Sequence, residues 1–161
     1  MSDFVIYEEE FRRVDEELRR LYHLANAKLV FLVDKNGQLI ASAGDTHNID
    51  TTALASLTAG NIAATGGIAK LLGQKEFSIL FHEGDRDNIH ISIVANKVIL
   101  GVLFDRRSSL GIVRLRVKKS TGALTRIFHE MDRKALGEKR GRAELSPFAE
   151  ITDEDIDQLF K

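Results

Sequence analysis

Two histidines and three acids surround one predicted hairpin turn, and their side chains are of the kinds that ligate metal ions. The cluster consists of His82, Glu83, Asp85, Asp87 and His90. Imidazole nitrogens and carboxylate oxygens coordinate zinc when several of them converge on one point, and the two histidines could approach each other across the turn. We favour the alternative that all five are solvated turn residues, and we predict no metal site.

Arginines and glycines suggest two kinds of phosphate chemistry. Arg106 and Arg107 follow a predicted strand in a loop, where a finger-like arginine for phosphoryl transfer would be placed. A surface pair at the head of a basic helix is the simpler interpretation. Gly60, Gly66 and Gly67 invite comparison with a phosphate-binding loop, but the Lys-Ser/Thr that must follow is missing, and these glycines lie inside a helical pattern. We therefore predict no catalytic residues and no cofactor, and expect a protein that is not an enzyme.

The segment 50–73 is the most informative stretch, because its pattern is helical while its centre carries almost no bulky side chains. Each interior glycine costs a helix about 1 kcal/mol relative to alanine, so the pair Gly66–Gly67 needs compensation. Close approach by another surface is the usual compensation, which predicts an interface. The alternative is a helix that breaks at Gly66–Gly67 and packs on its own sheet. The small central residues are Thr58, Gly60, Ala63, Ala64, Gly66 and Gly67.

Hydrophobic periodicity and turn signals define the elements that position these segments. The pair Asn36–Gly37, favoured in type I′ turns, predicts a hairpin, and Asp50 or Thr51 is expected to cap the small-residue helix. The order α-β-β-α-β-β-β-α favours an α/β protein of the α+β type, with helices on the faces of a five-stranded antiparallel sheet. The predicted elements are helices over 7–25, 50–73 and 110–135 and strands over 28–34, 38–43, 77–83, 88–95 and 98–105.

Charge is distributed unevenly over the last third of the chain. Residues 105–142 carry twelve lysines and arginines against four acids, a net charge of +8, whereas residues 143–161 carry six acids against one lysine, a net charge of −5. Such asymmetry indicates an interaction, within the chain or with a partner. Helical geometry scatters the basic residues over more than one face, and no aromatic residues alternate with them. Pairing with acidic groups, including the chain's own tail, is therefore favoured over nucleic-acid binding.

The C-terminal segments differ in character from the rest of the chain. We assign residues 1–136 to one domain, 137–147 to a flexible linker with the only proline, and 148–161 to an amphipathic docking segment. A helix of about eight residues is not stable alone in water, so docking is favoured over a frayed end. The apolar residues of the docking segment are Phe148, Ile151, Ile156, Leu159 and Phe160.

Composition bounds the class of protein. With 161 residues and a net charge of −1, the chain fits one globular domain with a short extension and is not a bulk polyanion binder. The absence of cysteine excludes disulfides and thiolate metal sites and suits a reducing cytosol. No apolar run approaches the roughly 18–20 residues that span a bilayer, and the acidic start lacks the basic region of a signal peptide. We expect a cytoplasmic protein without membrane insertion.

The element order, the Asn-Gly hairpin and the small-residue helix resemble the Roadblock family, the light-chain-type regulators of motors and small GTPases. The resemblance spans nearly the whole chain. It is carried by YEEEF (7–11), ANAKLVFLVDKNGQLIASAG (25–44), NIDTTALASLTAGNIAATGGIAKLLG (48–73), FHEG (81–84), FDRRSSLGIVRLRVKK (104–119) and SPFAEITDEDIDQLF (146–160).

The resemblance implies a homodimer that binds one Ras-like GTPase in its GTP-bound form. It implies that the dimer activates GTP hydrolysis without donating an arginine finger, in bacterial cell polarity and motility, with concentration at a cell pole. It places the GTPase contact on the small-residue helix, and assigns the docking segment to a grip on the GTPase that is linked to nucleotide exchange. The contact residues carried over are Gly60, Ala63, Ala64, Gly66 and Gly67, with Thr65 as a departure from a flat surface.

A ligand-binding sensory domain of the PAS or GAF type is the alternative function. Such domains also wrap helices around an antiparallel sheet. This alternative would need a cavity lined by polar groups.

Overall fold

The computed structural model describes the backbone of residues 7–145 and the side chains of residues 7–140. The predicted docking segment 148–161 lies outside the described residues. The observed elements are α1 (Glu8–Leu24), β1 (Leu29–Asp34), β2 (Leu39–Gly44), α2 (Thr51–Leu71), β3 (Ile79–Glu83), β4 (Asn88–Val94), β5 (Val98–Phe104) and α3 (Leu110–Leu145). This order confirms the predicted α-β-β-α-β-β-β-α arrangement.

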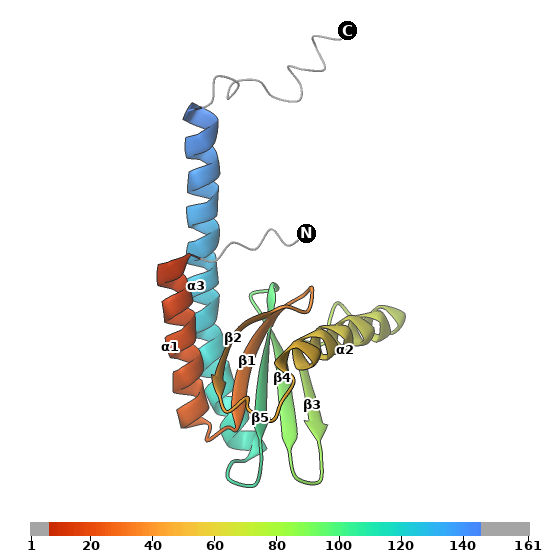
Figure 1. The fold of residues 1–161 in the computed structure, drawn as a ribbon. Coiled ribbons are helices and arrows are strands. Elements are labelled where there is room, and N and C mark those ends of the chain that lie inside the picture. Colours follow the sequence, from red (N-terminus) through yellow and green to blue (C-terminus); the bar gives the residue numbers. More distant parts are fainter. Residues whose placement is uncertain (1–6, 146–161) are drawn as a thin grey trace.

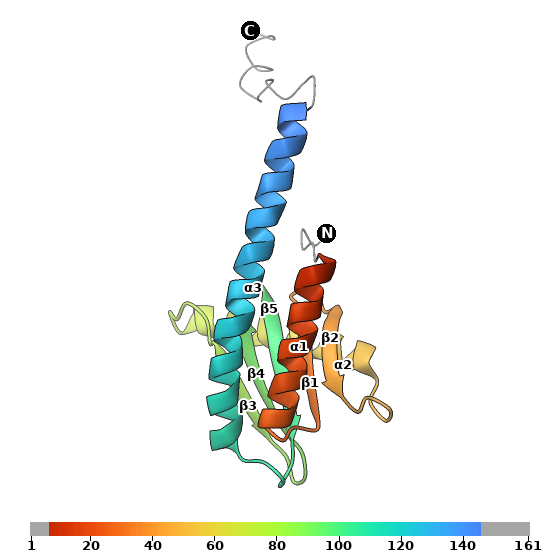
Figure 2. The same ribbon diagram turned by 90° about the vertical axis from the view of Figure 1, so that its left-hand side faces the viewer.

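The five strands form one sheet in the order β2-β1-β5-β4-β3, and every neighbouring pair is antiparallel. Helices α1 and α3 lie side by side on one face, and α2 crosses the other (Figures 1 and 2). Alternation along β1 separates two apolar layers: Val30 and Leu32 pack toward α1 and α3, whereas Phe31 packs toward α2. The predicted five-stranded antiparallel sheet with helices on its faces is therefore confirmed.

The turn between β1 and β2 differs from the predicted type I′ geometry. Only Gly37 has a positive φ, of +91°, whereas a type I′ turn requires positive φ at both central residues. The carboxylate of Asp34 is buried and accepts hydrogen bonds from the backbone amides of Asn36 (2.9 Å) and Gln38 (3.0 Å). These two bonds stabilise a different turn.

Positive φ at two successive residues occurs instead in the turn between β4 and β5. Ala95 and Asn96 have φ of 53° and 55°, and the backbone amide of Lys97 donates to the carbonyl of Val94 at 3.0 Å. This is the arrangement expected of a tight two-residue hairpin.

Helix α2 is continuous. Asp50 is its N-cap, as predicted, and its carboxylate accepts from the backbone amide of Ala53 at 3.0 Å. The helix runs without interruption to Leu71, so the alternative of a break at Gly66–Gly67 is wrong.

Helix α3 is longer than predicted and continues to Leu145. Residues 137–145 are therefore helical, which corrects the prediction of a flexible linker for this part of 137–147. Polar pairs to α1 hold α3 beyond the sheet: Glu10 with Lys134, Arg13 with Glu130, and the Tyr7 hydroxyl donating to Glu138 at 2.8 Å. Within residues 7–145, no helix combines the length and apolar character needed to cross a membrane.

Candidate functional site

The two halves of α2 have different environments. In the N-terminal half, Ala55, Ala59 and Ile62 are buried against the sheet, in the layer that contains Phe31 and Ile99. The part of α2 after Ile62 projects past β3 (Figure 1), and among its residues only Ala69 is buried. The small central residues are thus placed where the helix leaves its own sheet.

Two adjacent stripes run along the exposed side of α2, because residues three, four and seven apart share a helix face. One stripe, which we call the small-residue stripe, consists of Gly60, Ala63 and Gly67, all exposed. Beside it lies an apolar ridge, in which Leu57, Ile68 and Leu71 are 73%, 53% and 87% exposed. The members of the ridge are Leu57, Ala64, Ile68 and Leu71.

The six predicted contact residues therefore do not form one face. Gly60, Ala63, Ala64 and Gly67 are exposed, but Thr65 and Gly66 are half-buried on the side nearer the sheet. The Thr65 hydroxyl donates to the carbonyl of Asn61 at 2.8 Å, which satisfies it within the helix.

The helical glycines have no steric reason within the described chain. A Cβ built on Gly60, Gly66 or Gly67 meets no heavy atom within 4 Å. By contrast, a Cβ on Gly101 of β5 would lie 2.1 Å from Cζ of Phe31. Gly101 is required by its own core, and the glycines of α2 are not.

The apolar surface beside the small-residue stripe was not predicted from the sequence. Leu71, Leu57 and Leu72 are the three most exposed large apolar side chains among the described residues. Ile79 of β3 is 50% exposed nearby in the chain, and β3 is an edge strand with one unpaired side. The seven- and fourteen-residue spacing of Leu57, Ala64 and Leu71 was the available signal.

Opposite faces of the sheet separate the two histidines of the hypothetical metal cluster. His82 of β3 is paired with Ile89, which faces α2, and its Nε2 lies 2.9 Å from Nδ2 of Asn61. His90 of β4 is buried on the α3 side beside Phe81, so the prediction that all five residues are solvated turn residues is wrong for His90. The two cannot share an ion, and no group of three histidine or acidic residues in the described part of the chain could hold a metal.

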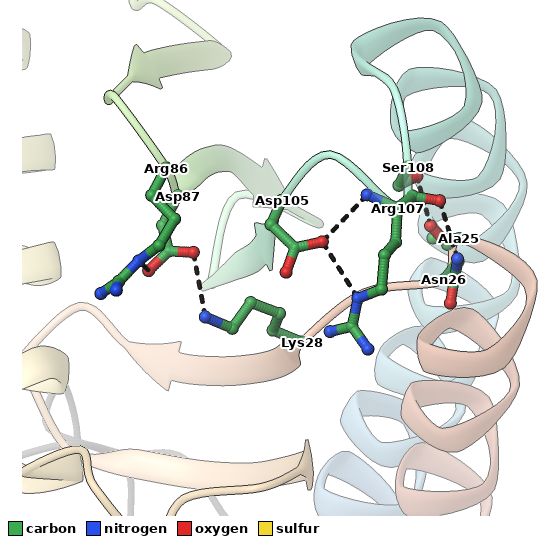
Figure 3. A network of polar contacts seen from close by, with 8 residues as sticks. All are labelled: Ala25, Asn26, Lys28, Arg86, Asp87, Asp105, Arg107 and Ser108. Atoms are coloured by element: carbon green, nitrogen blue, oxygen red, sulfur yellow. Dashed lines mark hydrogen bonds and ion pairs between the residues drawn. The ribbon is translucent and has the colours of Figure 1, made fainter.

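The loop that carries Arg106 and Arg107 is fixed by internal contacts (Figure 3). The Arg107 backbone amide and its Nε both donate to Oδ1 of Asp105, at 3.0 and 3.1 Å, and these bonds lower the pKa of the Asp105 carboxyl. Asn26 Nδ2 donates to the Arg107 carbonyl at 2.7 Å, and the Ser108 hydroxyl donates to the carbonyl of Ala25. These contacts tie the loop to the end of α1, which gives Arg107 a structural role.

Comparison with known proteins identifies relatives of this arrangement. The Roadblock/LC7 domain matches residues 13–104. MglB of Myxococcus xanthus is 60% identical, with a TM-score of 0.75 over 79% of this chain and 96% of that chain. The gliding protein MglB of Thermus thermophilus is 31% identical, with a TM-score of 0.75 over 81% of this chain and 98% of that chain.

A more distant structure shows the shared fold alone. A Roadblock/LC7 domain from Streptomyces avermitilis is 14% identical, with a TM-score of 0.65 over 71% of this chain and 97% of that chain. A comparison with curated protein sequences found no match. Because the domain match covers more than half of the chain and the similarity to MglB extends over most of both chains, this protein belongs to the Roadblock/LC7 family.

Proposed function

We propose that this protein regulates a small Ras-like GTPase of the MglA type, and that it activates GTP hydrolysis through contact with the switch regions of the GTP-bound form. The observation that carries the proposal is the open small-residue stripe of Gly60, Ala63 and Gly67, next to a fold shared with MglB. The protein itself supplies no catalytic residue in this proposal. Its surface favours a switch arrangement in which the GTPase's own residues reach the γ-phosphate.

The cost of the glycines supports this assignment. Each exposed helical glycine costs about 1 kcal/mol relative to alanine, and alanine would fit at Gly60, Gly66 and Gly67 without touching the rest of the chain. The cost is therefore not offset by packing within the protein. A partner whose backbone approaches α2 closely would offset it, since a methyl group would then be too large.

An arginine finger is not needed in this proposal. The Arg107 guanidinium is bonded to Asp105 and its backbone carbonyl is bonded to Asn26. Arg106 is exposed in the same loop, at the start of α3 rather than on α2. Neither residue belongs to the small-residue stripe.

We propose further that the functional form is a homodimer that binds one GTPase. The apolar ridge of α2 and the unpaired edge of β3 are adjacent surfaces that a second copy would cover, because exposed apolar ridges and open strand edges both favour association. A solved MglB with 30% identity is described as having a tetrameric arrangement. In this arrangement the small-residue stripes of two subunits would lie near each other and form one platform.

The remaining parts of the proposal follow the family resemblance. Residues 148–161, with Phe148, Ile151, Ile156, Leu159 and Phe160, would grip the GTPase away from its active site and promote nucleotide exchange. The setting would be the cytoplasm, at a cell pole, in polarity and motility.

Substitution of Ala63 tests the platform. Ala63→Arg places a large side chain in the stripe, so we expect loss of stimulated GTP turnover by an MglA-type GTPase, with an unchanged circular dichroism spectrum. Ala53→Arg is the matched control, because Ala53 is exposed in the first turn of α2 and lies outside the stripe. Equal stimulation by wild type and Ala63→Arg would contradict the proposal. A co-purified small ligand detected by native mass spectrometry would instead favour the PAS or GAF alternative.

A further inference from the structure

The outer surface between α1 and α3 contains a groove in which cations outnumber acids. Figure 2 shows the two helices side by side on this face. Two adjoining hollows of about 330 and 420 Å³ share Glu17, Arg20, Ala123 and Arg126 in their linings. The charged residues that line this α1–α3 groove are Arg13, Arg20, Arg116, Lys119 and Arg126, with Glu16 and Glu17.

Most of these cations have no acidic partner. Arg13 pairs with Glu130. Among the residues whose side chains are described, no carboxylate lies within 4.0 Å of the side-chain nitrogens of the other four cations. Nε of Arg116 is buried and has no hydrogen-bond partner within this part of the chain. Arg19 and Lys134 on the same helices are paired, whereas Lys118 and Arg133 of α3, which lie outside the groove, have no ion pair among the described residues.

The groove also has an apolar component. Leu21 and Ile127 line it and are almost fully buried, and Leu24 lines it with 43% of its surface exposed. Ala123 lies in both hollows and leaves space between the long basic side chains. A short amphipathic helix with acidic and apolar groups would match this combination.

We propose that the α1–α3 groove binds the chain's own C-terminal segment, residues 148–161. This segment supplies five acids, Glu150, Asp153, Glu154, Asp155 and Asp157, between the apolar residues Phe148, Ile151, Ile156, Leu159 and Phe160. The unpaired cations Arg20, Lys119 and Arg126 complement the acids, and the apolar residues complement Leu24 and the floor of the groove.

The segment is long enough to reach the groove of its own subunit. The helix rise of 1.5 Å per residue places Arg126 about 28 Å from the end of α3 at Leu145. Seven residues, the number in 146–152, could span about 24 Å if fully extended. A helix over 153–160 would then cover roughly the next 12 Å. This brings it beside Arg126 and Ala123.

Docking of the tail has a regulatory consequence, which rests on the proposed function. The apolar residues assigned to the GTPase grip are the same residues that would occupy the groove. The two contacts therefore exclude each other. While the tail is docked in the groove it cannot bind the GTPase, and the GTPase must compete with the groove for it.

Cross-linking tests the docking without any GTPase. The chain has no cysteine, so the full-length pair Ala123→Cys/Lys161→Cys reports proximity by forming a disulfide. The control pair is His129→Cys/Lys161→Cys: His129 is exposed, does not line the groove, and is nearer to the tail along α3. We expect the groove pair to oxidise about tenfold faster than the control, because docking raises the effective concentration above that of a free tail.

Reversing the charge of groove cations, or adding salt, shows whether the cross-link depends on the groove. Lys119→Glu/Arg126→Glu is expected to reduce cross-linking in the groove pair to the control rate. Lys118→Glu/Arg133→Glu, which makes the same charge change at exposed α3 positions outside the groove, is expected to leave it unchanged. A salt concentration of about 1 M should also abolish the difference in oxidation rate between the groove pair and the control pair. Equal rates for the groove and control pairs would overturn the proposal, and so would a disulfide that joins two chains.

A binding measurement tests the regulatory consequence separately. If the tail is docked about nine-tenths of the time, Lys119→Glu/Arg126→Glu should tighten binding of the GTP-loaded GTPase about tenfold, whereas Lys118→Glu/Arg133→Glu should not. If Lys119→Glu/Arg126→Glu loses the cross-link but binds the GTPase with unchanged affinity, the groove and the GTPase do not compete for the tail. Absence of GTPase binding by every variant would count against the proposed function and leave the cross-linking result standing.

Discussion

Gly101 of β5 and the glycines of α2 have opposite environments, although both interrupt apolar segments. The Phe31 ring occupies the space that a Gly101 side chain would need, with its Cζ 2.1 Å from the position of a Cβ. Around Gly60, Gly66 and Gly67 that space is empty. The first glycine is explained by the interior of this protein. The others have no such explanation among the described residues.

The same contrast extends to whole surfaces. The layers between the sheet and its helices are closed by buried residues such as Leu18, Phe128 and Phe31. The far end of α2 exposes Leu71 and Leu72. A closed region should respond to substitution through stability, and an open region through association and activity.

The largest effect is expected in the closed region. Gly101→Val would force Phe31 out of its position under α2, which should destabilise the protein by about 3 kcal/mol or more. Chemical denaturation measures this loss. A variant with the same denaturation midpoint as the wild type would contradict this prediction, because it would mean that the Phe31 contact is adaptable.

The apolar ridge should respond through association. Leu71→Asp places a charge on the most exposed apolar residue of the described chain, so we expect a dimer to become a monomer in sedimentation, with the folded spectrum unchanged. Leu136→Asp is the matched control, because Leu136 is an exposed leucine of α3, remote from the ridge. Dissociation by the control alone would place the subunit contact on α3 instead.

We expect the folding stability to depend on pH through His90, which is buried on the α3 side of the sheet. His90 is 1% exposed, and neither ring nitrogen has a hydrogen-bond partner among the described residues. Burial, and then the charge of Arg114, lowers its pKa below the usual value of 6.5. The unfolded chain therefore binds the proton more readily, and folding stability should fall as the pH drops below about 6.5.

Melting temperatures at pH 7.5 and 5.5 measure this dependence. His90→Leu should remove part of the decrease between the two pH values, because the buried imidazole no longer takes up a proton on unfolding. His129→Leu, at an exposed position of α3, should retain it. Identical decreases in wild type and His90→Leu would contradict the assignment.

The smallest effect is expected when the same substitution, glycine to alanine, is made in α2 and in β5. Gly67→Ala has space for its methyl group, so we expect it to stabilise the fold by up to about 1 kcal/mol. Gly101→Ala should destabilise it, since even one methyl group would contact Phe31. Denaturation midpoints that move in the same direction for both variants would show that the two glycines do not differ as the structure indicates.

Local patterns in the sequence predicted most of the fold. Apolar periodicity predicted the helices and strands in their correct order, and Asp50, one of the two predicted candidates, is the cap of α2. These features depend on neighbouring residues, so a single sequence contains them. The unusual composition of α2 likewise pointed to the segment that the structure leaves open.

Features that depend on distant residues were decided only by the tertiary structure. Pairing with α1 accompanies the extension of α3 through residues predicted as a linker. The pairing of β3 with β4 put His82 and His90 on opposite faces. The position of the sheet beneath α2 divided its small residues between an exposed stripe and a half-buried side. Spacing along a chain specifies which side chains can share a face, but only packing between elements determines which face remains accessible.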